Sequence, residues 1–206
     1  LAAQPIPPSD PHYDEARKVY NAMIDRRPGL IARCADVADV QTAVNFAREQ
    51  KLLLSIRGGG HNAVGLGVCD DGLVIDLSPM RYVRVDPKKK TVLVGGGSLW
   101  GDVDHATHAF GLAVPAGIIS TTGVGGLTLG GGIGHLTRQY GLSNDSMLAV
   151  DMVLADGRFV TASAKENSDL IWAVRDGGSN SGDVTSFLFK AHPVHTNYAG
   201  PMLWEM

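Results

Sequence analysis

The feature that most constrains this chain is a run of three glycines at positions 58–60, between an apolar stretch and a histidine. Residues 52–56 are almost entirely apolar, and Arg57 and His61 flank the glycines. Glycine accepts backbone conformations that other residues avoid, and it lets another group lie against the main chain. Consecutive N–H groups in such a loop can converge on an anion, and an arginine adds positive charge. The run therefore predicts a loop that binds the phosphates of a cofactor, with His61 in reach of that cofactor.

Two well-known nucleotide motifs do not account for this loop. Gly58 to Ala63 matches the letters G-x-G-x-x-A, but that fingerprint works when a helix begins at the loop and receives the pyrophosphate. Residues 64–72 contain three glycines and no amphipathic pattern, so no helix is expected there. The P-loop pattern G-x-x-x-x-G-K-[ST] does not occur in the sequence. A nicotinamide reductase of Rossmann type is therefore the less favoured alternative. A colourless, flavin-free protein that gives a signal in a titration with NADH would support it.

Composition narrows the class of protein. With 206 residues the chain can form one large domain or two closely joined ones. A net charge of −3 without a basic block argues against nucleic acid as a partner. The 26 glycines fall in clusters, which indicates binding loops lined by main chain. Cys34 and Cys69 lack metal-type spacing and are expected to be buried thiols, although the spacing leaves a disulfide between them open. No metal site is expected.

The sequence also carries signals about location. No apolar run is long enough to span a bilayer, and no signal peptide is seen, so we expect a cytoplasmic protein without a membrane partner. The chain begins at Leu1 rather than methionine, so we expect its start to have been trimmed. The oligomeric state is not indicated by any feature.

The first part of the chain reads as a small parallel α/β unit. Residues 1–12 are rich in proline and are expected to be irregular. Asp10 and Pro11 suit a helix start, and apolar residues then recur at helical spacing up to Ile24. A strand over 30–32, a helix after Asp36, and strands over 52–56 and 73–77 follow. Strand–helix–strand order with buried apolar runs is typical of a parallel sheet.

The second part reads as an antiparallel sheet with helices. The stretch 111–134 has nine glycines and almost no charge, so we expect it to be buried against something other than its own side chains. Turn signals and apolar runs predict the other elements. They are strands over 83–85 and 91–94, a helix from Leu99, strands over 147–154 and 159–162, a helix from Asn167 or Ser168 to Val174, and a strand over 185–190.

Several long motifs in a fixed order carry a family resemblance. They occupy residues 57–62, 117–134, 138–145, 151–158 and 170–175. Together they resemble FAD-linked oxidases of the vanillyl-alcohol oxidase and p-cresol methylhydroxylase superfamily, and most closely the berberine-bridge-enzyme-like branch. The resemblance runs from about Asp10 to Pro193, and a bacterial member is expected.

The resemblance implies an α+β FAD-binding domain of the p-cresol methylhydroxylase type. An N-terminal segment and helix over 1–28 would precede a small parallel α/β subdomain over 29–78. A larger subdomain of antiparallel sheet with helices would follow over 79–206. Family members continue into a substrate domain that supplies the catalytic base. That domain is expected to be absent from this chain, so the catalytic residues are unknown.

The resemblance also implies the cofactor and its contacts. In the family, the histidine at the position of His61 is bonded to the 8α carbon of the flavin, which raises the flavin's reduction potential. The family's second attachment point, a cysteine, falls at Ile119, so FAD is expected to be attached through His61 alone or not covalently. The residues implied at the cofactor are Ile56, Arg57, Gly58, Gly59, Gly60, His61, Asn62, Ile119, Thr121, Thr122, Gly123, Val124, Gly125, Gly126, Leu127, Ile133 and Val184.

The implied reaction is hydride transfer from a substrate C–H bond to FAD, with O2 as the acceptor. The substrate would be a small molecule, namely an alcohol, a sugar or a secondary metabolite. The rival interpretation is an isolated flavin-binding module without turnover, because the partner domain is expected to be missing.

The sequence departs from the family pattern after Arg175. Asp176 interrupts the usual glycine run, Ser181 replaces an aromatic residue, and Asp183 replaces an aliphatic one. Burying an unpaired carboxylate is unfavourable. We therefore expect either that this loop is exposed or that its contact with the flavin is weakened.

Overall fold

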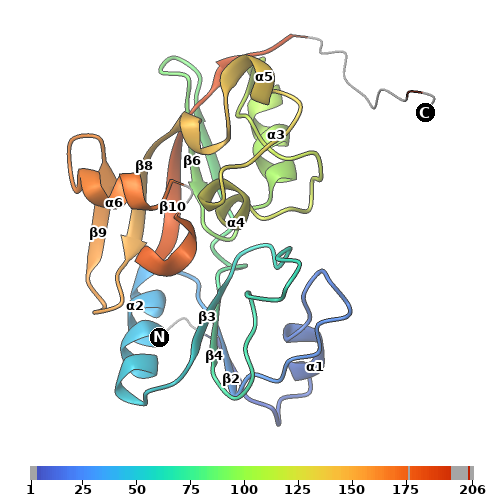
Figure 1. Ribbon diagram of the computed structural model, residues 1–206, viewed down its shortest axis with the longest axis vertical. Coiled ribbons are helices and arrows are strands. Elements are labelled where there is room, and N and C mark those ends of the chain that lie inside the picture. Colours follow the sequence, from blue (N-terminus) through green and yellow to red (C-terminus); the bar gives the residue numbers. More distant parts are fainter. Residues whose placement is uncertain (1–3, 176, 196–203, 205–206) are drawn as a thin grey trace.

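The chain folds around two sheets that lie one above the other along its long axis (Figure 1). The computed structural model describes residues 4–175, 177–195 and 204. The smaller sheet has the strand order β1-β2-β4-β3, and the larger one has the order β5-β6-β10-β8-β9. Parallel and antiparallel sheets with helices are both present, so the predicted α+β class is confirmed.

The smaller sheet is built as the apolar runs predict. Strands β2 (Leu30–Arg33) and β3 (Leu54–Arg57) both pair in parallel with β4 (Leu73–Asp76). Helix α2 (Val37–Glu49) covers one face of this sheet (Figure 1). Its first turn is capped by the Asp36 carboxylate, which accepts from the Asp39 amide at 3.0 Å. The parallel register places the C-terminal ends of the three strands at one edge of the sheet.

The N-terminal region differs from the sequence prediction in two ways. Residues Gln4–Ile6 form strand β1, which pairs antiparallel with β2 at the sheet edge and buries Ile6. An edge strand tolerates proline because its outer N–H groups need no partner. The helix expected from Asp10 to Ile24 is wrong beyond one turn, because α1 covers only Tyr13–Ala16. Backbone contacts with the glycine loop, described below, replace the later helical bonds.

The larger sheet follows the predicted hairpins. Its strands are antiparallel, and helices α3, α4 and α5 lie together beside it in Figure 1. Helix α6 lies next to β9 on the other side. Strands β7 and β11 pair with each other in a separate two-stranded sheet. The elements of this part of the chain are β5 (Val83–Asp86), β6 (Thr91–Gly95), α3 (Trp100–His108), β7 (Leu112–Ala113), α4 (Val124–Leu129), α5 (Thr137–Tyr140), η1 (Asn144–Ser146), β8 (Met147–Val153), β9 (Phe159–Ser163), α6 (Ser168–Ala173), η2 (Gly178–Ser181), β10 (Asp183–Lys190) and β11 (His192–Pro193).

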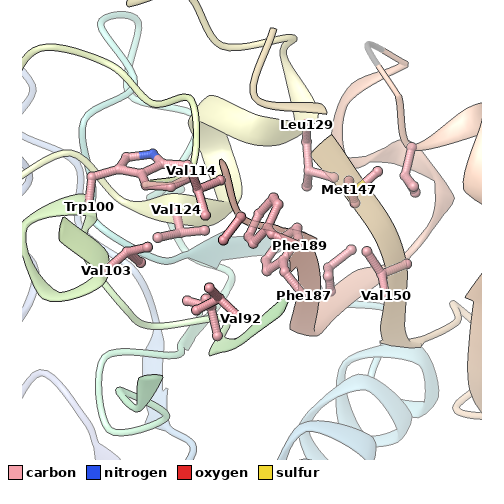
Figure 2. Packing of buried hydrophobic residues seen from close by; sticks show 14 of the residues in the cluster. Val92, Trp100, Val103, Val114, Val124, Leu129, Met147, Val150, Phe187 and Phe189 are labelled. Carbon is pink, nitrogen blue, oxygen red and sulfur yellow. The ribbon is translucent and has the colours of Figure 1, made fainter. Parts of the chain in front are cut away.

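Two phenylalanines organise the core of the larger sheet. Phe187 and Phe189 alternate along β10, opposite Val94 and Val92 of β6, and both are fully buried. Their rings stack with centroids 5.7 Å apart. Figure 2 shows them at the middle of the cluster, with Trp100 on one side. Each buried aromatic of this kind stabilises a fold by about 3–5 kcal/mol against truncation to alanine.

Two further sequence expectations concern cysteines and membranes. Cys34 and Cys69 are both buried and both free, so the disulfide left open by the spacing does not form. Across the described part of the chain, no helix combines the length and the apolar character needed to cross a bilayer. The same residues contain no cluster of three or more ligands suited to a metal ion.

Candidate functional site

Three glycine clusters meet at the junction of the two sheets. A methyl group built on Gly59 would lie 2.4 Å from the Gly123 nitrogen, and one built on Gly58 would lie 3.1 Å from the Gly96 oxygen. Gly58 and Gly59 follow β3, Gly96 follows β6, and Gly123 precedes α4. Main chain therefore packs directly against main chain, which no larger residue at Gly59 or Gly123 would allow.

The loop itself has the conformation that its glycines permit. Gly60 has φ of +68°, a left-handed value that favours glycine. The Asn62 side-chain oxygen accepts from the amides of Val64 and Leu66 and so closes the next turn. Residues 61–72 form turns and bends without any helix, so the structure agrees with rejecting the dinucleotide fingerprint.

His61 is held at the edge of this junction by three contacts. Its Nε2 lies 3.1 Å from the Thr121 hydroxyl, and its Nδ1 lies 3.5 Å from the Thr122 hydroxyl. The Tyr20 ring stacks on the imidazole with centroids 3.9 Å apart. Burial lowers the pKa of His61, and a hydrogen bond to the Thr121 main chain opposes that shift by raising it. The imidazole is therefore neutral at pH 7 and keeps a lone pair for use as a nucleophile.

The Arg57 charge is already paired within the protein. Its Nη2 lies 3.1 Å from the Asp76 carboxylate, and both side chains are buried. The parallel register sets this pair, because Arg57 lies directly opposite Asp76 at the ends of β3 and β4. Arg33 approaches the same carboxylate at 3.6 Å. The sequence predicted that Arg57 adds a positive charge for an anion in the loop. In the structure Asp76 offsets this charge, and Arg57 instead fixes the start of the loop.

A cleft of about 590 Å³ opens beside the loop. Its size falls in the range of about 300–1,000 Å³ that is usual for cofactor and ligand sites. The wall includes residues 57–61 of the predicted segment 56–62 together with Thr121, whereas Ile56 and Asn62 at its two ends do not line the cleft. Residues that the sequence did not single out complete it, among them Lys18, Val19, Tyr20, Arg33, Asp76, Ser78 and Leu99.

The other predicted site residues divide into three groups by their burial. Ile119 and Ile133 are large apolar side chains left exposed, so the stretch 111–134 is covered only in part by the protein itself. Val124 and Val184 instead bury their side chains in the core, and any contact with a cofactor would use their main chain. Ile56 and Leu127 are half-buried, and Gly125 and Gly126 lie in the first turn of α4.

The departure from the family pattern has an unexpected outcome. Asp183 is 2% exposed, so the expectation of an exposed loop is wrong at this residue. Both carboxylate oxygens lack a hydrogen-bond partner within the described structure. Burial raises the pKa of Asp183 to about 7. Ser181 is half-buried at the end of η2, and Asp176 lies outside the described residues.

Sequence reasoning missed Tyr20, Asp76 and Leu99. Tyr20 was assigned to a helix face, yet its ring lies on His61. A signal for Asp76 was present, because it ends an apolar strand just as Arg57 does, and parallel strands bring such ends together. A methyl group built on Gly59 would lie 3.2 Å from Cδ2 of Leu99, so the two residues are close neighbours. No sequence pattern indicated this proximity.

Fold and site together define a flavin-nucleotide-binding domain, since the residues present fit FAD. Glycine main chain forms a cradle for phosphates, a cleft of suitable size adjoins it, and His61 lines that cleft with its ring nitrogens near two threonine hydroxyls. Residues 28–163 match the family described as "FAD binding domain". The chain belongs to this family and is an FAD-binding domain.

Relatives support the same assignment. The chain is 40% identical to an FAD-linked oxidoreductase of Dictyostelium discoideum over 95% of its length and 43% of the relative. It matches 6-hydroxy-D-nicotine oxidase from Arthrobacter nicotinovorans with a TM-score of 0.92 and 36% identity, over 94% of this chain and 43% of that one. It matches BBE-like 1 from Physcomitrella patens with a TM-score of 0.88 and 35% identity, over 93% and 42%.

A third structure bears on the attachment of the cofactor. Glucooligosaccharide oxidase from Acremonium strictum, matched with a TM-score of 0.86 and 31% identity over 92% of this chain and 40% of that one, is described with a cysteinyl and histidyl FAD. The chain spans about two fifths of the length of the curated relatives it matches. The predicted superfamily, the berberine-bridge-enzyme-like branch and FAD as cofactor are confirmed by these findings.

Proposed function

We propose that this chain holds FAD in the cleft beside residues 58–61 and forms the cofactor half of an oxidase. The observation that carries the proposal is the convergence of three glycine clusters on one junction, with His61 in the wall of the adjoining cleft. When bound, FAD would supply the redox chemistry of the proposed reaction, which is removal of a hydride from a substrate C–H bond with O2 as the final acceptor.

The residues of this chain have binding and orienting roles in that reaction. The main-chain N–H groups of 58–60, 125 and 126 would receive the pyrophosphate, because the amides of Thr122 and Val124 already donate to the carbonyls of Ile119 and Ser98. His61 would bond to the flavin ring. Arg57 and Asp76 fix the start of the loop as a buried ion pair. Ile119 and Ile133 offer apolar surface to the cofactor. None of these groups is a strong base placed to take a substrate proton, so we assign no catalytic base within the site.

The substrate is proposed to be a small molecule, an alcohol, a sugar or a secondary metabolite. The names of similar proteins support this range, which extends from 6-hydroxy-D-nicotine oxidase to glucooligosaccharide and xylooligosaccharide oxidases. The acceptor is proposed to be O2 because these relatives are named oxidases.

The division into subdomains over 29–78 and 79–206 is also a proposal. Its support is that β4 ends at Asp76 while β5, in the other sheet, begins at Val83. The cofactor would lie at the seam between the two units, where ligand sites are common. The cytoplasmic location stays a prediction from the sequence.

The decisive experiment for His61 is intact mass combined with acid precipitation after incubation with FAD. We expect the wild-type chain to gain the mass of one FAD and to keep its yellow colour in the precipitate. His61→Ala is expected to lose both signals, because the proposed bond forms at the His61 imidazole. His108→Ala serves as a matched control, since His108 is an exposed residue at the end of α3. A wild-type chain without added mass would contradict covalent attachment.

A further inference from the structure

Tyr20 combines high exposure with a specific ring contact. Its side chain is 67% exposed, so burial of apolar surface does not explain its place. Nevertheless its ring lies face-on against the imidazole of His61, with centroids 3.9 Å apart and planes 19° from parallel. A stacked pair of this kind is worth about 0.5–1.5 kcal/mol, enough to favour one orientation of the imidazole over others.

The backbone around Tyr20 is tied to the glycine loop. The Tyr20 amide donates to the Gly60 carbonyl at 3.0 Å, and Arg57 donates to the Lys18 carbonyl at 3.3 Å. Arg57 is itself fixed by its buried pair with Asp76. The segment 18–20 is therefore anchored to the loop that carries His61. The Tyr20 ring and the His61 imidazole are therefore carried by two stretches of main chain that are hydrogen-bonded to each other.

The ring nitrogens of the imidazole are held by hydroxyl groups. Thr121 lies 3.1 Å from Nε2, and Thr122 lies 3.5 Å from Nδ1. An unrestrained histidine rotates about two side-chain torsions. Stacking on the ring face and hydrogen bonding at the ring edge together restrict both torsions. The imidazole is thus fixed before any cofactor is bound.

We propose that Tyr20 is a positioning residue for His61, which holds the imidazole in the orientation required for bonding to FAD. This inference rests on the proposed function. Attachment forms one bond between a ring nitrogen of His61 and the 8α carbon of the flavin. The carbon loses one proton, the imidazole loses its N–H proton, and the two electrons released pass to O2, which becomes H2O2. The step needs an aligned ring nitrogen, and misalignment by about 1 Å can slow such a reaction about a hundredfold.

The test measures the rate at which the purified 206-residue chain gains the mass of FAD in air at saturating FAD. We expect Tyr20→Ala to slow this rate at least about tenfold, because the imidazole is no longer held in place. Tyr20→Phe keeps the stacked ring and is expected to stay within about twofold of wild type. Met23→Ala is the matched control, because Met23 is 89% exposed in the same segment.

A second measurement separates positioning from cofactor binding. In the His61→Ala background, where no bond can form, Tyr20→Ala is expected to change the Kd for FAD by less than about threefold. A rate for Tyr20→Ala equal to that of wild type would overturn the inference. The inference would also be overturned if Tyr20→Ala weakened the Kd for FAD by as large a factor as it slowed the gain of mass. A wild-type chain that binds FAD without gaining mass would overturn the inference and leave the FAD assignment standing, whereas a chain that binds no FAD would overturn both.

Discussion

At the scale of single residues, burial acts in opposite directions on two titrating groups. It lowers the pKa of His61, which keeps the imidazole neutral and nucleophilic. It raises the pKa of Asp183 to about 7, because the carboxylate is enclosed without a partner in the described structure. The first shift serves the proposed chemistry. The second makes the folded state less stable as the pH rises.

The effect of Asp183 on stability has a definite sign. Unfolded aspartate has a pKa near 3.8, so between pH 4 and 7 the unfolded chain releases this proton while the folded chain keeps it. Asp183 therefore has no pH-dependent effect on the free energy of unfolding below pH 4, and it lowers that free energy increasingly up to about pH 7. We expect Asp183→Val to raise the free energy of unfolding at pH 8 by about 2–4 kcal/mol, since each pKa unit corresponds to about 1.4 kcal/mol. Urea unfolding at pH 5 and pH 8 measures both values.

Asp183→Asn provides the matched control, because it removes the charge and keeps the size and polarity. It is expected to reduce the pH dependence without the full gain seen for valine. A variant Asp183→Val that is less stable than wild type at pH 8 would show that the carboxylate has a stabilising partner in solution.

At the scale of elements, local sequence signals and long-range contacts decided different parts of the fold. The apolar runs and the Asp36 cap predicted β2, α2 and β4 closely, because these signals act within one element. The helix expected up to Ile24 ended after α1, because the Tyr20 amide bonds to Gly60, forty residues away in sequence. No periodicity within residues 10–24 could have indicated that partner.

The glycine clusters show the same limit for the site. Their number and spacing predicted main chain open to a ligand, but not that Gly59 would pack against Gly123. At Asp183 the two signals conflicted, because the family pattern has an aliphatic residue there whereas a charged residue is ordinarily exposed. Both features depend on how the two sheets approach each other.

The contact between loops yields a test at this scale. Gly59→Ala places a methyl group 2.4 Å from the Gly123 nitrogen, so the backbone must shift. We expect a loss of about 1–3 kcal/mol in the free energy of unfolding, as for other overpacked sites, together with weaker FAD binding. Urea unfolding and flavin fluorescence titration measure the two effects.

Gly130→Ala is the control for that substitution, because a methyl group there would meet its nearest atom at 3.5 Å, an ordinary contact. Its stability is expected to stay within about 0.5 kcal/mol of wild type. Equal free energies of unfolding for Gly59→Ala and Gly130→Ala would mean that the main chain at Gly59 does not pack against that at Gly123.

At the scale of the whole molecule, two sheets with separate cores share one cleft. The core of the smaller sheet includes Val153 of β8, so the two units are joined by packing as well as by the chain. The glycine clusters follow or precede elements of both units, and Gly58 and Gly59 after β3 meet Gly96 after β6 and Gly123 before α4. Binding of a cofactor at this seam depends on the relative placement of the units.

The most direct test of the central claim is a titration of the isotope-labelled chain with FAD, followed through its backbone amide signals by NMR. The account predicts the largest shifts at the amides of 58–60 and of 125–126, because these N–H groups meet the cofactor in the glycine cradle. FAD binding that leaves both sets of amides unmoved, or no binding at all, would contradict it.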